Sequence, residues 1–447
     1  MKNILTLTEN KWFPLVLGVL VALAMIFIGA VNTVGLGIGI IIIALMFKKP
    51  FYAILLYVVG LPFLQDIHIM YLGILVIGIY GVNFIKDGTF KYNYSKVNLS
   101  ILLLGIIITI STLLSINPRG SFRDFAIHFV GLGILFVFLH SSKTKKDLHD
   151  LNIVLVLTAT VIAAYGIYQF FNGVPMESGW LDVSQNPDIK TRVYATFENP
   201  NLLAEYLIMI FPISLGLFLY NRDFIRKMIF AFTSIIILIT IGLTYSRGSW
   251  LGMAFGIVLF LMLINWKALL GLIPLGIAGL FVLPASILQR IQTIGSLQDS
   301  SNLYRFNLWI KSMDIIKDFW LSGIGIGYIP FQQVSHLYIT NMAPYHTHNT
   351  YLQIAIEMGI PGLLVFIALI LISFKTAVGV VLNSGQKYYR LFVAAYIASI
   401  SGILVHGLAE HIFFNPKIIL VFWLIFGILV NYLQLYGEER IRIINKG

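Results

Sequence analysis

Long apolar runs separated by short polar stretches fill most of the chain. A helix needs about 20 residues to cross roughly 30 Å of hydrocarbon. The runs predict up to fourteen spans, at 13–30, 33–47, 51–65, 69–85, 97–116, 122–140, 151–171, 201–220, 228–245, 249–265, 268–288, 350–374, 391–409 and 416–436. The second and third are short enough to be re-entrant. We therefore expect an all-α, polytopic membrane helix bundle with 12–14 transmembrane helices.

The basic residues set the expected orientation of this bundle. With the N-terminus placed inside, 20 of the 30 Lys and Arg residues fall in inner segments. Cytoplasmic loops carry such an excess, so both termini are expected to be cytoplasmic. The first 20 residues lack a small-residue cleavage site, so we interpret the first run as a retained span and not as a signal peptide.

Composition supports the membrane class and excludes several others. The chain of 447 residues is 58% hydrophobic and 11% charged, whereas a soluble domain carries about 25% charged residues. It has no cysteine, which excludes disulfides, thiolate metal sites and thiol nucleophiles. The net charge of +11 is explained by the basic inner loops, and no nucleic-acid partner is expected.

Ten basic residues fall on the expected outer side, against the usual bias. They are Arg119, Arg123, Lys190, Arg192, Arg247, Arg290, Arg305, Lys311, Lys317 and Lys417. Six are arginines, whose planar fork suits bidentate binding of phosphate or carboxylate. Interfacial anchoring or pairing with acidic residues would explain any single one equally well.

A large outer loop, 289–348, contains a helical pattern within "NLYRFNLWIKSMDIIKDFW". Its apolar residues recur at helical spacing, at Leu303, Phe306, Trp309, Ile310, Met313, Ile316 and Trp320. Arg305 shares the remaining surface, so we expect a helix lying on the outer membrane surface. The glycines at 323, 325 and 327 follow no βαβ pattern, so they predict a tight turn and not a dinucleotide site.

The segment "YHTHNTYLQIAIEMGIPG" places polar residues at the mouth of a span. Asn349, Gln353 and Glu357 are four residues apart and share one helix face, which must face the bundle or water. His348 lies at the outer end of that face, where a neutral imidazole could accept a proton from a sugar hydroxyl. Glu357 lies about 13 Å further along the helix, so we expect it to have a structural role.

Two other readings of these histidines stay open. His348 could simply bond the backbone at a helix N-terminus. With His336 and His346 it could instead bind zinc, but the spacing is irregular and no H-E-x-x-H motif occurs. We expect no metal and no cofactor.

Three further segments bring polar residues to the same outer ends. In "RVYATFENPNLLAEYL", Asn199 can cap a helix that carries Asn201, and Arg192 precedes it, which suits an anion or only a well-capped helix. In "TYSRGSWLG", a short turn holds Arg247 near the membrane surface, either for a diphosphate or for anchoring. In "HGLAEHIFFNP", His406, Glu410 and His411 lie at another outer end, where they could orient a base or an acceptor sugar, or pair with an arginine.

These segments together resemble the O-antigen ligase and polymerase superfamily. The family signature is His, then Asn, Ser or Gln, nine residues, Gly, two residues, and Gly, Thr or Tyr; here these are His348, Asn349, Gly359 and Gly362. "ATFENPNLLAEYL", "YSRGSWLG" and the segment 304–331 are also similar to its recurring segments. The similarity covers about 190–420, which divides the chain into N-terminal transmembrane helices, 1–190, and a catalytic region, 191–447, that includes the outer loop 289–348.

The resemblance implies a metal-independent, inverting glycosyltransferase with a GT-C-like fold. Such enzymes move a glycan from undecaprenyl diphosphate to an acceptor, a glycan or lipid-linked glycan, at the outer face of the bacterial cytoplasmic membrane. By position, His348 corresponds to the histidine that activates the acceptor hydroxyl. Arg247, Arg305 and, less directly, Arg192 correspond to diphosphate-binding arginines, with supporting roles for His346, Asn349, Asn199, Asn201 and Glu410.

The signature does not separate the branches of this superfamily. We favour a surface polysaccharide polymerase, closely followed by a ligase acting on lipopolysaccharide; a protein O-oligosaccharyltransferase shares the same motif. A lipid-linked glycan flippase is the alternative from another class. It would show internal repeats and broken helices near the midplane, whereas here the polar residues gather at the outer ends and no repeat is found.

Overall fold

The computed structural model describes residues 19, 21, 25, 29–88, 95–140, 144–177, 180, 189–295, 300–339 and 344–444. Within these ranges every regular element is a helix and none is a strand. Eleven of the described helices are long and apolar enough to cross a membrane. The expected all-α, polytopic membrane bundle is therefore confirmed.

The helices follow one another with short connections. The first part of the described chain forms α3 (Ala30–Lys48), α4 (Phe51–Gly60), α5 (Asp66–Asp87), α6 (Lys96–Leu113), α7 (Pro118–His140), α8 (Lys145–Asn172), α9 (Pro200–Tyr220) and α10 (Phe224–Leu243). The second part forms α11 (Arg247–Asn265), the 3₁₀ helix η1 (Trp266–Gly271), α12 (Leu272–Val282), α13 (Ala285–Gln292), α14 (Ser300–Asp318), α15 (Tyr328–Tyr338), α16 (Thr350–Asn383), α17 (Lys387–His406) and α18 (Pro416–Ile444).

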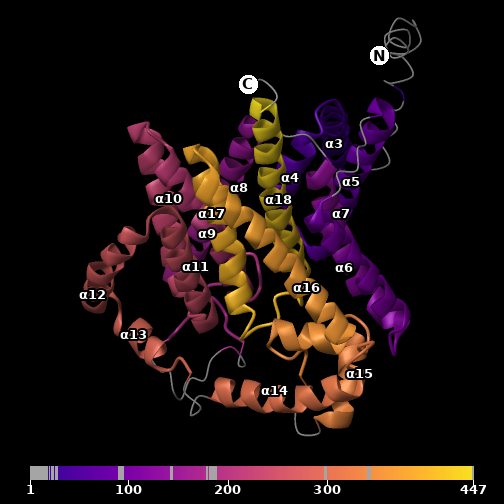
Figure 1. The fold of residues 1–447 in the computed structure, drawn as a ribbon, viewed down its shortest axis with the longest axis vertical. Helices are drawn as coiled ribbons and strands as arrows, with labels where there is room; N and C mark the ends of the chain where they lie inside the picture. Colours follow the sequence, from indigo (N-terminus) through magenta and orange to yellow (C-terminus); the bar gives the residue numbers. More distant parts are fainter. Residues whose placement is uncertain are drawn as a thin grey trace, which may run out of the picture.

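Helices α9, α17 and α18 form the centre of the bundle (Figure 1). Their apolar windows are 78%, 89% and 83% buried, far more than those of the surrounding helices. Helix α11 lies so close to α17 that a Cβ atom at Gly252 would be 2.3 Å from the carbonyl oxygen of Gly402. Small residues allow such backbone contact between membrane helices. This packing fixes the relative positions of the helix ends that carry the polar residues.

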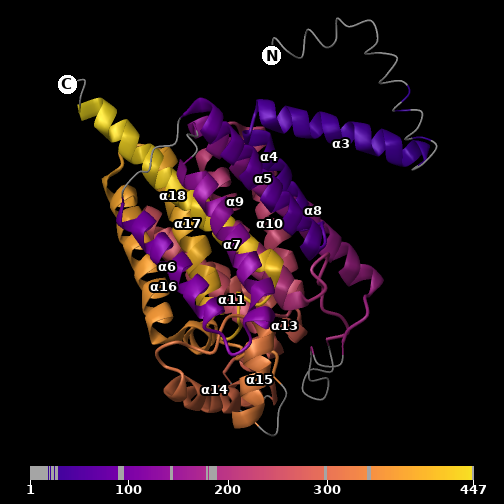
Figure 2. The same cartoon turned by 90° about the vertical axis from the view of Figure 1, so that its right-hand side faces the viewer.

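Helix α14 lies across one end of the bundle, and α18 ends at the other (Figures 1 and 2). We call the first end the α14 end. Helix α14 packs inward through Leu308 and Ile315, which are fully buried, whereas Phe306 and Met313 remain about half exposed. The exposed residues belong to the apolar face expected from the sequence, and α14 occupies the place expected for the surface helix.

Among the described residues, two expected spans do not form a helix long enough to cross the membrane. The first expected span, 13–30, lies largely outside the described residues. The run 51–65 forms a helix of only ten residues, and α3 lies across the bundle at the end opposite α14 (Figure 2). The expected span 268–288 is wrong, because α12 has only 11 residues and Pro284 ends it, whereas a crossing needs about 20.

Candidate active site

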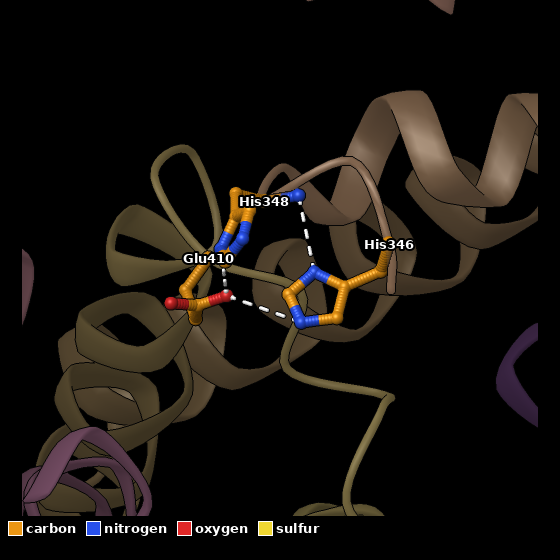
Figure 3. Close-up of side chains that lie close together, drawn as sticks. All are labelled: His346, His348 and Glu410. Atoms are coloured by element: carbon orange, nitrogen blue, oxygen red, sulfur yellow. Dashed lines mark hydrogen bonds and ion pairs between the residues drawn. The ribbon is translucent and has the colours of Figure 1, made fainter. Parts of the chain in front are cut away.

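His348 and Glu410 meet at the α14 end, from two loops that are far apart in sequence (Figure 3). His348 directly precedes the cap of α16, and Glu410 lies between α17 and α18. The Nδ1 atom of His348 lies 2.8 Å from the Oε1 atom of Glu410. The backbone of His348 has a φ of 49°, which is rare for a residue with a side chain. Such strain at a polar cluster is typical of a functional site.

Glu410 collects donors from several elements. Its Oε1 atom accepts the amide of His411 at 3.2 Å, and its Oε2 atom accepts Nδ2 of Asn201 at 3.4 Å and pairs with Nη2 of Arg305 at 3.6 Å. Burial by itself would raise the pKa of Glu410, but His348 and Arg305 outweigh it and hold that pKa well below its usual value. Glu410 is therefore a carboxylate at neutral pH.

The ionised carboxylate determines the tautomer of His348. A carboxylate can only accept hydrogen bonds, so the Nδ1 atom of His348 carries the proton. The other ring nitrogen, Nε2, has no hydrogen-bond partner among the described residues, and the side chain is 26% exposed. An imidazole held this way by a carboxylate presents an unprotonated nitrogen to a reactant, as in serine hydrolase triads.

His346 lies beside the His348–Glu410 pair and contacts both residues (Figure 3). Its Nδ1 atom accepts the amide of His348 at 3.1 Å, and its Nε2 atom lies 3.7 Å from Oε1 of Glu410. Burial, reinforced by the neighbouring His348, lowers the pKa of His346 to about 3. His346 therefore remains neutral and holds the loop in place without competing for the proton.

Four arginines gather in this region, Arg192, Arg247, Arg290 and Arg305, and Arg305 pairs with Glu410. Arg192 is buried and donates to the carbonyl oxygens of Thr244, at 2.8 Å, and Trp180, and to Oδ1 of Asn201 at 3.0 Å. Burial, followed by the charges of Arg290, Arg247 and Arg305, lowers the pKa of Arg192 to about 9. Guanidinium groups gathered close enough to repel one another form a site that an anion would stabilise.

Arg247 and Arg305 reach this region from different helices. Arg247 is the first residue of α11, and its Nη1 atom donates to the carbonyl oxygen and hydroxyl of Thr293 at 3.0 and 2.9 Å. Arg305 comes from α14 and donates to the Ser301 hydroxyl at 2.8 Å, while its Nε atom is buried without a partner. The arginines therefore come both from the bundle and from α14, the helix that lies across its end.

Asparagine caps place the ends of α9 and α16 beside this cluster. The Oδ1 atom of Asn199 accepts the amide of Asn201 at 2.8 Å, and that of Asn349 accepts the amides of Tyr351 and Leu352, both at 3.0 Å. Such caps satisfy the first amides of a helix. The expected helix starts are therefore present, and α9 turns Asn201 towards both Arg192 and Glu410.

Helix α16 is broken at Gly359, and the break explains the second half of the signature. Gly359 has a φ of 69°, and a Cβ atom there would lie 2.5 Å from the carbonyl oxygen of Leu321. The amides of Ile324 and Gly325 pair with the carbonyl oxygens of Ile356 and Glu357 at 2.8 and 3.1 Å. We call residues 320–327, which run beside the break, the strap.

The strap joins the two parts of the site. It begins at the end of α14, which carries Arg305, and is fixed to α16, whose N-terminal cap follows His348. The glycines at 323, 325 and 327 all have positive φ, so the tight turn expected from the sequence is present. Glu357 accepts Nε2 of Gln353 at 2.9 Å and the amide of Gly327 at 3.2 Å.

His346, His348 and Glu410 also have the geometry of a metal site. One ligand atom from each lies within 4.8 Å of the others. The guanidinium of Arg305 lies 3.6 Å from the carboxylate of Glu410, so its positive charge would repel a metal ion bound there. The hydrogen bond between His348 and Glu410 already uses the atoms that an ion would need.

Several polar residues of this region were missed in the sequence. Arg290 is buried on the short helix α13 and donates to Tyr245 at 3.5 Å, but it was treated only as one outer charge among ten. Glu205 accepts Nε2 of His406 at 2.9 Å and ties α9 to α17 one turn away from Asn201. Asn201 and Glu205 are four residues apart, and this spacing predicts that they share one face of α9.

The comparison with family models agrees with the similarity found in the sequence. The family model described as O-antigen ligase matches residues 206–367, which include Arg247, Arg305 and His348. Arg192 and Glu410 lie outside the matched range. No curated protein matches the chain. The match of residues 206–367 supports the similarity of this multi-pass membrane protein to the O-antigen ligase superfamily of membrane enzymes that process glycans.

Proposed function

We propose that the protein transfers a glycan from undecaprenyl diphosphate to an acceptor hydroxyl at the outer face of a bacterial cytoplasmic membrane. The observation that carries this proposal is the pairing of His348 with Glu410 beside four arginines. A general base for a hydroxyl and a cationic site for a diphosphate are the two functions that such a transfer needs. The polymerase branch is favoured, and ligase and protein-glycosylating activities are outcomes of the test.

His348 acts as the base through its Nε2 atom. Glu410 holds the ring through Nδ1 and stabilises the imidazolium that forms when Nε2 takes up a proton. The carboxylate does not itself receive the proton. His346 stays neutral beside it because its pKa lies at about 3.

The diphosphate binds among Arg247, Arg305 and Arg192. The buried Nε atom of Arg305 lacks a partner, and an oxygen of the leaving diphosphate would satisfy it. Arg192 is held by Thr244 and Asn201, so it presents a fixed charge instead of a mobile one. Arg305 lies on α14, so substrate binding draws this helix onto the bundle, as lids do in other enzymes.

An open apolar groove beside the site offers a place for the lipid tail. Helices α11, α16 and α17 form it, with Phe255 and Leu259 on one wall and Phe374 and Leu404 on the other. Tyr351, three residues after His348, also lines the groove. Its hydroxyl donates to the carbonyl oxygen of Leu404 at 2.9 Å. A polyprenyl chain in this groove would reach the site laterally from the membrane.

The chemical step breaks one bond and forms one. The acceptor oxygen attacks the anomeric carbon from the side opposite the diphosphate, while His348 Nε2 removes the hydroxyl proton. The bond between the anomeric carbon and the phosphate oxygen breaks, and undecaprenyl diphosphate leaves with the electron pair. The arginines stabilise the charge that develops on it, and the configuration at the anomeric carbon is inverted.

Transfer by the purified protein in liposomes tests the proposal. The substrates are lipid-linked glycan from producing cells and a panel of acceptors: the same glycan, a lipid A core and a Ser- or Thr-containing peptide. We expect new glycosidic bonds in EDTA, loss of transfer in His348→Ala, and retention in His336→Ala, which alters an exposed histidine on α15. Glycan that crosses the bilayer without any new bond would identify a flippase and contradict the proposal.

A further inference from the structure

A narrow cleft lies beside the loop that carries Glu410. Its polar walls come from five parts of the chain: α7, the start of α15, the loop before α16, the N-terminal half of α16 and the loop after α17. The residues that matter for its chemistry are Asp124, His128, Tyr328, Tyr345, Glu357 and His411. The floor leaves room for about one water-sized group.

Two imidazoles in this cleft have buried nitrogens without partners. His128 and His411 are 93–95% buried, and the Nδ1 atom of each lacks a hydrogen bond. Leaving a buried polar atom unsatisfied is unfavourable, so these atoms point to a ligand that forms hydrogen bonds. Among the described residues that line the cleft, none is Lys or Arg.

The carboxylates of the cleft are suited to hydroxyl groups. Asp124 accepts the amide of Tyr328, and Glu357 accepts the amide of Gly327, so both are held on the same short segment. Each retains capacity to accept further hydrogen bonds, because a carboxylate offers about four acceptor sites. With two carboxyl groups and no Lys or Arg among its described lining residues, the cleft favours a neutral, hydroxyl-rich group over a diphosphate.

Two tyrosines form a flat surface at the mouth. The rings of Tyr328 and Tyr345 stack with centroids 5.5 Å apart and an angle of 25° between their planes. Tyr345 is 63% exposed, so its ring is available to a ligand. A sugar ring can lie against such an aromatic surface with its apolar face while one hydroxyl reaches the floor.

The cleft is next to the catalytic pair. His411 follows Glu410 in the chain, and its ring lies 5.6 Å from that of His346. We propose that this cleft is the subsite that binds a sugar of the acceptor, with its hydroxyls on Asp124, Glu357 and His411 and its ring on Tyr345. This inference rests on the proposed function, and it assigns the acceptor to the side opposite the arginines.

Direct binding tests the subsite without relying on transfer. The probe is the oligosaccharide released by mild acid from the lipid-linked glycan of producing cells, which carries no diphosphate. Its affinity for the full-length protein in detergent is measured by calorimetry for the wild type, Tyr345→Ala and Asp124→Asn. Tyr168→Ala is the matched control, because Tyr168 is 61% exposed and stacks on Tyr165 of α8, outside the cleft.

We expect Tyr345→Ala and Asp124→Asn to weaken probe binding about three- to tenfold. Both should leave the affinity for undecaprenyl diphosphate, which carries no glycan, within twofold, and Tyr168→Ala should change neither. Equal binding of the probe by the wild type and both cleft variants would overturn the subsite, as would a selective loss of lipid-diphosphate binding. Failure of the wild type to form glycosidic bonds would instead contradict the proposed function, while the binding result would still decide the subsite.

Discussion

The two sides of Glu410 have opposite chemistry within one small region. On one side lie the guanidiniums of Arg192, Arg247, Arg290 and Arg305. On the other lie Asp124, Glu357 and two imidazoles with unpartnered nitrogens. A two-substrate transfer between an anionic donor and a neutral acceptor needs this separation, because each side disfavours the other's ligand.

Glu410 lies at the boundary and is coupled to both sides. It accepts from Asn201 and pairs with Arg305 on the arginine side, while His348 and the amide of His411 approach from the cleft side. The strap provides the second connection. It begins at the end of α14, and the amide of its Gly327 donates to Glu357 of α16. The comparison therefore predicts that changes at the boundary affect turnover, whereas changes on either side affect one substrate.

The largest effect is expected at the boundary, in Glu410→Gln. The amide would neither fix the tautomer of His348 nor stabilise the imidazolium, so kcat should fall roughly 10²–10⁴-fold. The measurement is single-turnover transfer at saturating donor and acceptor. Glu198→Gln, an exposed carboxylate outside the site, should retain wild-type kcat. A kcat within threefold of wild type in Glu410→Gln would remove Glu410 from the mechanism.

The next effect concerns the strap, in Gly359→Ala. A side chain at this φ is strained, and its Cβ atom would meet the backbone of Leu321, so unfolding free energy should fall by about 2 kcal/mol or more. Thermal unfolding in detergent measures it. Gly379→Ala on the same helix has no atom within 4 Å of the new Cβ and should be neutral or slightly stabilising. Equal melting temperatures for the two variants would show that the break tolerates a side chain.

A smaller effect is expected on the arginine side. Arg305→Lys and Arg247→Lys keep the charge but lose the planar fork, so lipid-diphosphate binding should weaken about tenfold. Binding of the diphosphate-free oligosaccharide should be unchanged, which is the reverse of the result for Tyr345→Ala. Arg119→Lys, at an exposed position, is the control. If the arginine variants lost oligosaccharide binding as well, the two sides would not be separate subsites.

The sequence predicted the helices better than the contacts between their ends. Apolar runs identify spans because each must cover the membrane thickness, and they failed at 268–288, where prolines and glycines shorten the helix. The signature indicated His348, whereas its contact with Glu410 spans 62 residues and depends on how α16 and α17 pack. The cleft could not be predicted, because Asp124 comes from α7 and His411 from the loop after α17, and the sequence pattern does not specify that these two parts are neighbours.

The smallest effect separates the histidines by pH. The folded-state pKa of His346 is about 3, below the value of about 6.5 in an unfolded chain. Its contribution to stability is therefore complete above pH 6.5 and is lost as the pH falls towards 3, by about 1.4 kcal/mol per pH unit at most. The pKa of His411 is also lowered by burial, so each histidine contributes part of the dependence of stability on pH.

Melting temperatures from pH 6.5 to 5 should fall less steeply in His346→Gln than in wild type, whereas His336→Gln, at an exposed position, should match wild type. Identical slopes in all three proteins would show that His346 takes up its proton in the folded state as readily as in the unfolded one.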